Sequence, residues 1–169
     1  MICADDVLEV VACLEAASVA VWLDGGWGID ALLGTETRPH DDLDIVMAAA
    51  QLDAAQNALH ALGFVLAVDE LPTRCVLRDL ADRRIDVHPV VFDREGGGIQ
   101  QQPDGGIFRY PPEGFTGTGT VAGQAVRCLS PGVQLLCHLA YEPDANDIHD
   151  VRLLCNRFSF AVPDAYEDD

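Results

Sequence analysis

The spacing of apolar residues along the chain predicts helices and strands in alternation. Apolar residues recur every three or four positions in residues 5–17 and 51–62, which is typical of helices with one buried face. Short runs of β-branched, aromatic and other apolar residues instead predict strands. We expect these strands at residues 19–23, 44–47, 64–68, 74–80 and 84–92.

The second half of the chain has a less regular pattern. Residues 96–106 are rich in glycine and glutamine and predict a mobile connection. Residues 116–129 predict a hairpin that turns near Ala122-Gly123. Ser130-Pro131 combines an N-cap residue with a proline at the first helical position, which indicates a helix start. We expect the last two helices at residues 131–141 and 146–157.

This order of elements predicts an α+β fold, with a mixed β-sheet flanked by helices and a small helical C-terminal part. We expect a catalytic core in residues 1–93, a loop and hairpin in 94–129 and a helical part in 130–169, within one compact domain. The chain has 169 residues, of which 49% are hydrophobic, enough for one domain core. We expect a cytoplasmic location, because no apolar run approaches the roughly 20 residues of a membrane helix and no signal peptide is visible.

Two glycines and two aspartates give the strongest indication of chemistry. Gly25 and Gly26 follow the first predicted strand, where the absence of a Cβ lets the backbone turn and approach a ligand. We expect a short helix at residues 27–33, whose first N–H groups would suit a phosphate. Asp42 and Asp44 lie two residues apart at the next strand, so their carboxylates face the same side. Convergent carboxylates beside a phosphate site are suited to a divalent cation that carries a nucleotide.

A third carboxylate lies in the strand expected at residues 84–92. Asp86 and His88 share one face of that strand. If the strand is adjacent to the one that carries Asp44, three aspartates meet at one edge of the sheet, where two metal ions can bridge a triphosphate and the attacking oxygen. Aspartate is disfavoured within strands, which favours a functional role for Asp86 over a surface or capping role. For His88, a catalytic role and a packing role both stay open.

The charged residues and cysteines exclude several classes of protein. The chain has 28 acidic and 10 basic residues, no lysine and a formal net charge of −18. Without lysine there is neither a Walker-type phosphate loop nor Schiff-base chemistry. The charge disfavours a nucleic-acid partner and suits a cationic small molecule, although solubility alone would also account for it. The six cysteines contain no CxxC pair, which favours reduced thiols over disulfides or zinc.

The C-terminal helices offer candidate groups for an acceptor molecule. Tyr141 and Glu142 lie three and four residues after His138, and they would provide a stacking face and a carboxylate for an amine. Asp147 is a second candidate for this carboxylate. An ordinary amphipathic helix would explain the same pattern, and Asp147 and Asp150 would then lie on a solvated face.

The chain resembles a known family in its motifs GGWGID, LLG, TRPHDDLDI and RIDVHPV. From about Val19 to Phe158 it is similar to the small antibiotic nucleotidyltransferases of the DNA-polymerase-beta-like superfamily, in particular the lincosamide nucleotidyltransferases and the aminoglycoside 2''-adenylyltransferases. The resemblance implies the nucleotidyltransferase fold and Mg²⁺-dependent transfer of a nucleoside monophosphate, AMP first, from ATP to a drug hydroxyl. It further implies two Mg²⁺ ions and suggests a homodimer.

The resemblance also implies a role for each candidate residue. The metal ligands would be Asp42, Asp44 and Asp86. The groups close to the triphosphate would be Gly25, Gly26, Arg38 and His40. The acceptor hydroxyl would lose its proton to Asp86 or to His88, and the sequence does not decide between them.

Three classes of function are compatible with these observations. We rank an enzyme that adenylylates a small antibiotic first, with a lincosamide ahead of an aminoglycoside because of the segment Asp86-Val87-His88-Pro89 and the compact length. The second class is a nucleotidyltransferase acting on protein or tRNA ends, as some toxin partners do; the acidity of the chain and the absence of a basic patch weigh against the tRNA version. A nucleotide-binding module without turnover would be expected to lack one of the three aspartates, and all three are present.

Overall fold

The computed structural model describes residues 1–139 and 141–167, so positions 140, 168 and 169 of the expected C-terminal part lie outside the described residues. Its main sheet contains the strands β1 (Val21–Asp24), β2 (Leu43–Ala48), β3 (Val65–Glu70), β4 (Arg74–Arg78), β5 (Arg84–Phe92), β6 (Gly98–Gln101) and β7 (Ile107–Tyr110). Their order is β1-β2-β5-β4-β3, with β6 paired to β5 and β7 to β6. β2 and β5 run parallel, and the other neighbours are antiparallel.

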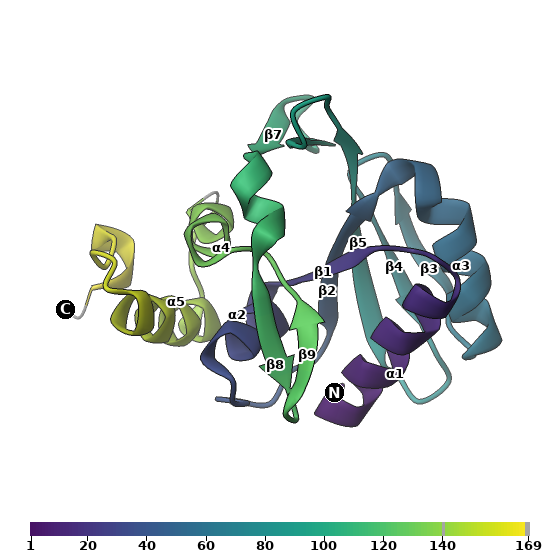
Figure 1. Ribbon diagram of the computed structural model, residues 1–169, viewed down its shortest axis with the longest axis horizontal. Helices are drawn as coiled ribbons and strands as arrows, with labels where there is room; N and C mark the ends of the chain where they lie inside the picture. Colours follow the sequence, from purple (N-terminus) through teal and green to yellow (C-terminus); the bar gives the residue numbers. More distant parts are fainter. Residues whose placement is uncertain (140, 168–169) are drawn as a thin grey trace.

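Helices and a second, two-stranded sheet surround this sheet (Figure 1). The hairpin consists of β8 (Thr118–Val121) and β9 (Gln124–Arg127), and the helices are α1 (Ala4–Ala16), α2 (Gly25–Leu33), α3 (Leu52–Ala61), α4 (Pro131–His138) and α5 (Ala145–Phe158). α1 and α3 pack together beside the sheet, whereas α2, α4 and α5 gather on the other side of the molecule (Figure 1). No helix in the described part of the chain has the length and apolar character needed to cross a membrane.

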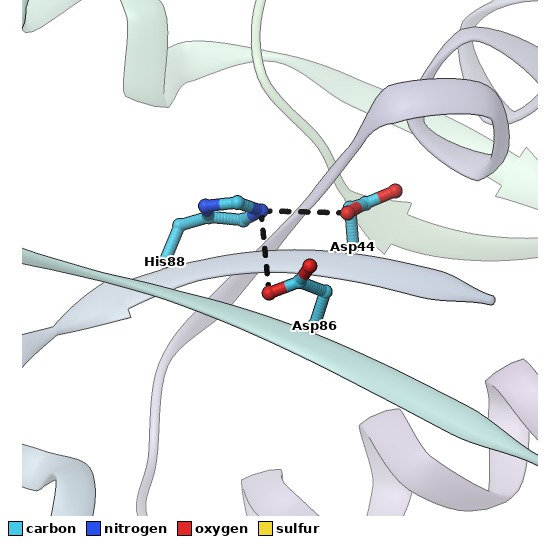
Figure 2. Close-up of side chains that lie close together, drawn as sticks. All are labelled: Asp44, Asp86 and His88. Carbon is cyan, nitrogen blue, oxygen red and sulfur yellow. Dashed lines mark hydrogen bonds and ion pairs between the residues drawn. The ribbon is translucent and has the colours of Figure 1, made fainter. Parts of the chain in front are cut away.

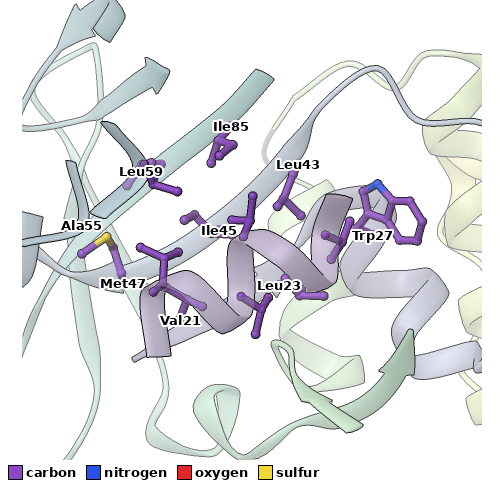
Figure 3. Close-up of a cluster of buried hydrophobic side chains, with 14 of the residues drawn as sticks. Val21, Leu23, Trp27, Leu43, Ile45, Met47, Ala55, Leu59 and Ile85 are labelled. Atoms are coloured by element: carbon purple, nitrogen blue, oxygen red, sulfur yellow. The ribbon is translucent and has the colours of Figure 1, made fainter. Parts of the chain in front are cut away.

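The two faces of the central strands have different roles, because side chains alternate along a strand. On β2, Leu43, Ile45 and Met47 are fully buried in the main hydrophobic core, which they share with residues of α1 and α3 (Figure 3). Asp44 and Val46 point to the opposite face. On β5 the same alternation sends Ile85 and Val87 to the core and Asp86 and His88 to the face that carries Asp44.

An aromatic cluster covers part of that opposite face and anchors the hairpin β6–β7. Trp22 on β1 donates a hydrogen bond from Nε1 to the carbonyl oxygen of Phe115 at 2.8 Å, and the two rings are in edge contact with their centroids 5.1 Å apart. Tyr110 on β7 packs against Phe115 with a centroid distance of 5.7 Å. The expectation of a mobile connection at residues 96–106 was therefore wrong. Long-range pairing with β5 and aromatic packing order this segment despite its glycines.

Other expectations agree with the structure to different degrees. β5 has the predicted bounds, the hairpin β8–β9 lies within residues 116–129, and α4 begins at Pro131 as its cap signal indicates. The short helix α2, however, begins at Gly25 rather than at residue 27, because Asp24 accepts a hydrogen bond from the Gly25 N–H and acts as the N-cap. α4 ends at His138, so the helical spacing argued for Tyr141 and Glu142 was wrong.

Candidate functional site

Asp44 and Asp86 are direct neighbours across the parallel strands β2 and β5, so the adjacency on which the carboxylate hypothesis depended is present. Together with His88 they form a compact group, in which one ligand atom from each residue lies within 4.8 Å of the others. His88 Nε2 lies 3.4 Å from Asp44 Oδ1 and 3.9 Å from Asp86 Oδ1 (Figure 2). Two carboxylates and an imidazole therefore converge on one point above the sheet.

The two oxygens of Asp86 have different environments. Oδ2 accepts a hydrogen bond from Nη1 of Arg74 at 2.5 Å. Oδ1 is buried and has no hydrogen-bond partner among the described residues. Burial raises the pKa of Asp86, and the nearby negative charge of Asp44 adds to this effect against the opposing charges of His88 and Arg74.

This donor set fits a divalent cation. An unpartnered buried carboxylate oxygen is costly unless a positive group satisfies it, and Asp86 Oδ1 lies 3.9 Å from His88 Nε2, too far for a hydrogen bond. Carboxylate oxygens are the ligands that Mg²⁺ prefers in proteins, where it usually keeps several water molecules as well. Asp44 and Asp86 are thus the residues of this structure best suited to hold a metal ion.

His88 directs a protonated nitrogen at the carboxylates. Its burial opposes the charged form, but the hydrogen bond and negative charge of Asp44, with the charge of Asp86, raise its pKa to about 9. Nδ1 lies 3.2 Å from the side-chain nitrogen of Gln100, which fits a neutral ring that carries its proton on Nε2. Both descriptions place a proton on Nε2, so we interpret His88 as a hydrogen-bond donor to Asp44.

The two glycines bring the start of α2 against these residues. Gly25 has a left-handed backbone with φ of +56°, and a Cβ at this position would lie 2.5 Å from Asp44 Oδ2. A Cβ on Gly26 would lie 2.5 Å from the Nδ1 atom of His40. Only glycine fits both positions without displacing a site residue. The first N–H groups of α2 are therefore held next to Asp44, where they can bind an anion.

Arg38 and His40 lie beside this helix start but are held by internal partners. Arg38 donates from Nε and Nη2 to the carboxylate of Asp150, with distances of 2.6–3.1 Å. His40 is buried, and its Nε2 lies 2.6 Å from Asp30 Oδ2. The solvated position expected for Asp150 was wrong, because this residue is only 1% exposed and forms the ion pair that fixes Arg38. Phosphate contacts by Arg38 and His40 stay a prediction.

Two cavities meet at this site. The first has a volume of about 300 Å³, and His88, Gln100 and Phe108 are among the residues that line it. The second, of about 280 Å³, is polar and is bounded by the start of α2, Arg38 and several aspartates. Four residues line both cavities, namely Gly25, Asp44, His138 and Tyr141.

Asp42 is the remaining predicted metal ligand. It lines the second cavity but lies outside the group of Asp44, Asp86 and His88. Desolvation and the negative charges of Asp44 and Asp86 raise its pKa, so it lies within electrostatic reach of them.

The candidates for acceptor binding lie after α4 and at the start of α5. Tyr141 donates a hydrogen bond to Asp147 Oδ1 at 2.9 Å, and both residues line the second cavity. Glu142 is exposed and lines neither of the two cavities.

Several site residues escaped the sequence reasoning, among them Asp24, Gln100 and Tyr110. Asp24 ends β1 and lines the first cavity, and an aspartate that ends an apolar strand before two glycines was a visible signal. Gln100 and Tyr110 come from the hairpin that was expected to be mobile. Tyr110 donates to Gln100 Oε1 at 2.7 Å, and Gln100 in turn donates to the carbonyl oxygen of Thr73 at 2.9 Å. Only tertiary pairing brings these two residues next to His88.

A mixed sheet that presents paired carboxylates beside a glycine-started helix is the arrangement expected from the resemblance to nucleotidyltransferases. The family model for aminoglycoside-2''-adenylyltransferases matches residues 6–154 of the chain. The chain is 30% identical over 149 residues to a lincosamide resistance protein of Staphylococcus haemolyticus, covering 88% of this chain and 92% of that protein. It is also 30% identical over 122 residues to a 2''-aminoglycoside nucleotidyltransferase of Klebsiella pneumoniae, covering 72% of this chain and 64% of the relative.

A solved structure agrees with these sequence matches. The lincosamide antibiotic adenylyltransferase LnuA, in its lincomycin-bound crystal structure, superimposes with a TM-score of 0.80 and 28% identity, over 90% of this chain and 96% of that one. The chain therefore belongs to the aminoglycoside-2''-adenylyltransferase family and has the α+β nucleotidyltransferase fold.

Proposed function

We propose that the protein transfers AMP from ATP to a hydroxyl of a small antibiotic, with a lincosamide as the first candidate and Mg²⁺ as the metal. The observation that carries this proposal is the pair of cavities that share Asp44 and Gly25. A group-transfer enzyme must bring two substrates to one point, and this arrangement provides two spaces that meet at the candidate metal ligands.

The triphosphate is assigned to the second cavity. The start of α2 offers N–H groups to an anion there, and Arg38 adds a guanidinium. This cavity also contains several aspartates, so a triphosphate needs cations to enter it. Asp44 and Asp86, with Asp42 close by, are the residues proposed to hold two Mg²⁺ ions. Mg²⁺ bound there would neutralise the phosphate oxygens and the charge of the leaving pyrophosphate.

The acceptor is assigned to the first cavity, on the side of Asp86 and His88. The acceptor oxygen forms a bond to the α-phosphorus of ATP while the bond to the bridging oxygen breaks, and pyrophosphate leaves. The hydroxyl proton passes to a carboxylate of the protein. We assign this role to Asp86 because its pKa is raised by burial, whereas the contact of His88 Nδ1 with Gln100 favours a proton on Nε2 of His88.

The choice of acceptor follows the relatives. The match to a lincosamide resistance protein covers more of both chains than the match to the aminoglycoside enzyme, and the lincomycin-bound structure has a TM-score of 0.80. An aminoglycoside is the second candidate, because the family model and three relatives carry that name. A homodimer, implied by the family resemblance, is part of the proposal and can be tested by light scattering.

The test is product detection by mass spectrometry. The protein is incubated with ATP, Mg²⁺ and either lincomycin or tobramycin at equal concentration. We expect lincomycin to gain the mass of AMP, with one pyrophosphate released per product. Modification of tobramycin alone would reverse the ranking of the two drugs. Absence of product from both would contradict the proposed substrate class, and ATP binding without transfer would favour the non-catalytic module.

A further inference from the structure

Asp24 is a buried carboxylate for which the proposed transfer reaction has no use. It is 8% exposed, and Oδ1 accepts a hydrogen bond from the N–H of Gly25 at 2.8 Å. It lies outside the group formed by Asp44, Asp86 and His88. It takes part in none of the ion pairs found among the described residues, although the charges of His88 and His138 act on it from a greater distance. Burying a carboxylate without a cationic partner is unfavourable, so a positive ligand is expected to complete its surroundings.

The cavity in front of Asp24 has aromatic walls. Phe108 and Tyr110 of β7 lie in edge contact with their ring centroids 4.7 Å apart, and Tyr141 lines the same cavity from the segment after α4. Burial raises the pKa of both tyrosine hydroxyls, and the negative charge of Asp24 adds to each shift, which places Asp24 within electrostatic reach of both rings. An anionic floor and aromatic walls form the usual surroundings of an alkylated ammonium group.

We propose that Asp24 and the rings of Phe108, Tyr110 and Tyr141 form an ammonium site, which holds the basic nitrogen of the acceptor while its hydroxyl lies near Asp86. This inference rests on the proposed function, since it takes the first cavity as the acceptor side. It makes Asp24 a residue that determines specificity. A neutral sugar of the same size would enter the cavity but would leave the buried carboxylate unpaired.

The electrostatics of the cavity agree with this role. Burial raises the pKa of Asp24, the charge of His88 opposes this effect, and the charge of Asp44 adds to it. A bound ammonium would offset both effects and stabilise the ionised carboxylate. The volume of about 300 Å³ is enough for a substituted amine and part of a sugar, but not for a whole antibiotic, so the rest of the molecule would extend toward the solvent.

The first test compares a charged and an uncharged acceptor in the intact protein. Asp24→Asn keeps the side-chain oxygen that caps α2, so the fold is expected to persist. Calorimetry measures the binding of lincomycin and of an analogue whose ring nitrogen is acetylated and therefore uncharged. We expect wild-type protein to prefer lincomycin more than tenfold, and Asp24→Asn to lose this preference. The KM for ATP should change less than twofold. Glu113→Gln, which removes an exposed carboxylate outside the cavity, is the matched control and should behave as wild type.

A second variant and a second probe separate the possible failures. Phe108→Leu removes one wall without touching Asp24 and should weaken lincomycin more than its acetylated analogue. Benzyltrimethylammonium, followed by ligand-observed NMR, should bind wild-type protein and be displaced by lincomycin. If the preference persists in Asp24→Asn, or if wild-type protein shows none, the ammonium site is wrong. If wild-type protein modifies neither drug but binds benzyltrimethylammonium in a way that depends on Asp24, the proposed function fails and the site stands.

Discussion

Asp44 lines both cavities and belongs to the candidate metal site. It lies on the site face of β2, contacts His88 and borders the start of α2. Removing one negative charge there would weaken the binding of cations without creating a void in the hydrophobic core. We expect Asp44→Asn to lower kcat/KM more than a hundredfold, about 2.7 kcal/mol of transition-state stabilisation.

The same substitution at Asp42 is expected to have a smaller effect on kcat/KM. Asp42 lies outside the compact group of ligands, so Asp42→Asn is expected to lower kcat/KM by at least about tenfold, or about 1.4 kcal/mol. Steady-state kinetics with saturating Mg²⁺ measures both variants, and circular dichroism checks the fold. Retention of more than about a tenth of the wild-type rate by Asp44→Asn would show that the interpretation of these aspartates as metal ligands is wrong.

Gly25 combines a backbone requirement with a steric one. Its φ of +56° disfavours any side chain, and a Cβ would collide with Asp44 Oδ2. Gly63 provides a matched control, because its φ is +90° and a Cβ added there would meet nothing within 4 Å. We expect both glycine-to-alanine variants to lose about 1–2 kcal/mol of stability, but only Gly25→Ala to lose activity. Urea unfolding and turnover assays measure the two effects, and equal activity loss in both variants would contradict the steric argument.

The candidate site was predictable as far as it depends on local pattern. The two-residue alternation of strands placed Asp86 and His88 on one face, and the structure confirms that they meet Asp44. The hydrogen bond from Gln100 toward His88 could not be predicted, because it depends on how a glycine-rich hairpin pairs with β5. The position of Asp24 in the sequence was informative, but its burial beside a cavity follows only from the folded structure.

At the scale of elements, the ion pair between Arg38 and Asp150 joins α5 to the segment before β2. Asp150 is almost fully buried, and the Arg38 side chain is 20% exposed. Removing the carboxylate would leave a guanidinium largely shielded from water. We expect Asp150→Asn to lower the free energy of unfolding by about 2 kcal/mol, below the value for fully buried pairs because Arg38 keeps some solvent contact.

Urea titration followed by tryptophan fluorescence measures this change. Asp53→Asn removes the same charge from an exposed position in the first turn of α3 and should alter stability by less than about 0.5 kcal/mol. An Asp150→Asn protein as stable as this control would show that the pair contributes nothing to the attachment of α5.

The predictability of the elements depends on where their stabilising contacts lie. β5 could be placed from sequence because its alternating β-branched residues match the pleat and the burial of a central strand. The sequence predicted that α4 continues to residue 141, because apolar residues follow His138. In the structure the helix ends at His138. The sequence did not predict β6 and β7. Ile99 of β6 pairs with Val91 of β5, and this tertiary contact outweighs the local preference of glycine for turns and loops.

At the scale of the whole molecule, the charge decides which partners can approach. The net charge is −18, and most of the basic residues are already engaged with acidic ones. The arginines in ion pairs with Asp or Glu are Arg38, Arg74, Arg78, Arg83, Arg84 and Arg127. Nucleic-acid affinity requires basic groups that neutralise phosphates and release counterions. The surface of this protein offers few such groups against a field that repels polyanions.

We therefore expect that neither duplex DNA nor tRNA binds the protein at roughly 150 mM salt. A gel shift with protein concentrations up to about 10 μM measures this. A cationic acceptor should behave in the opposite way, with a KM that rises as salt screens the attraction. The same ATP-dependent assay run across salt concentrations measures this second effect. A micromolar gel shift at physiological salt would favour a transferase acting on nucleic-acid ends. A KM for the acceptor that does not change with salt would show that the negative field has no part in substrate capture.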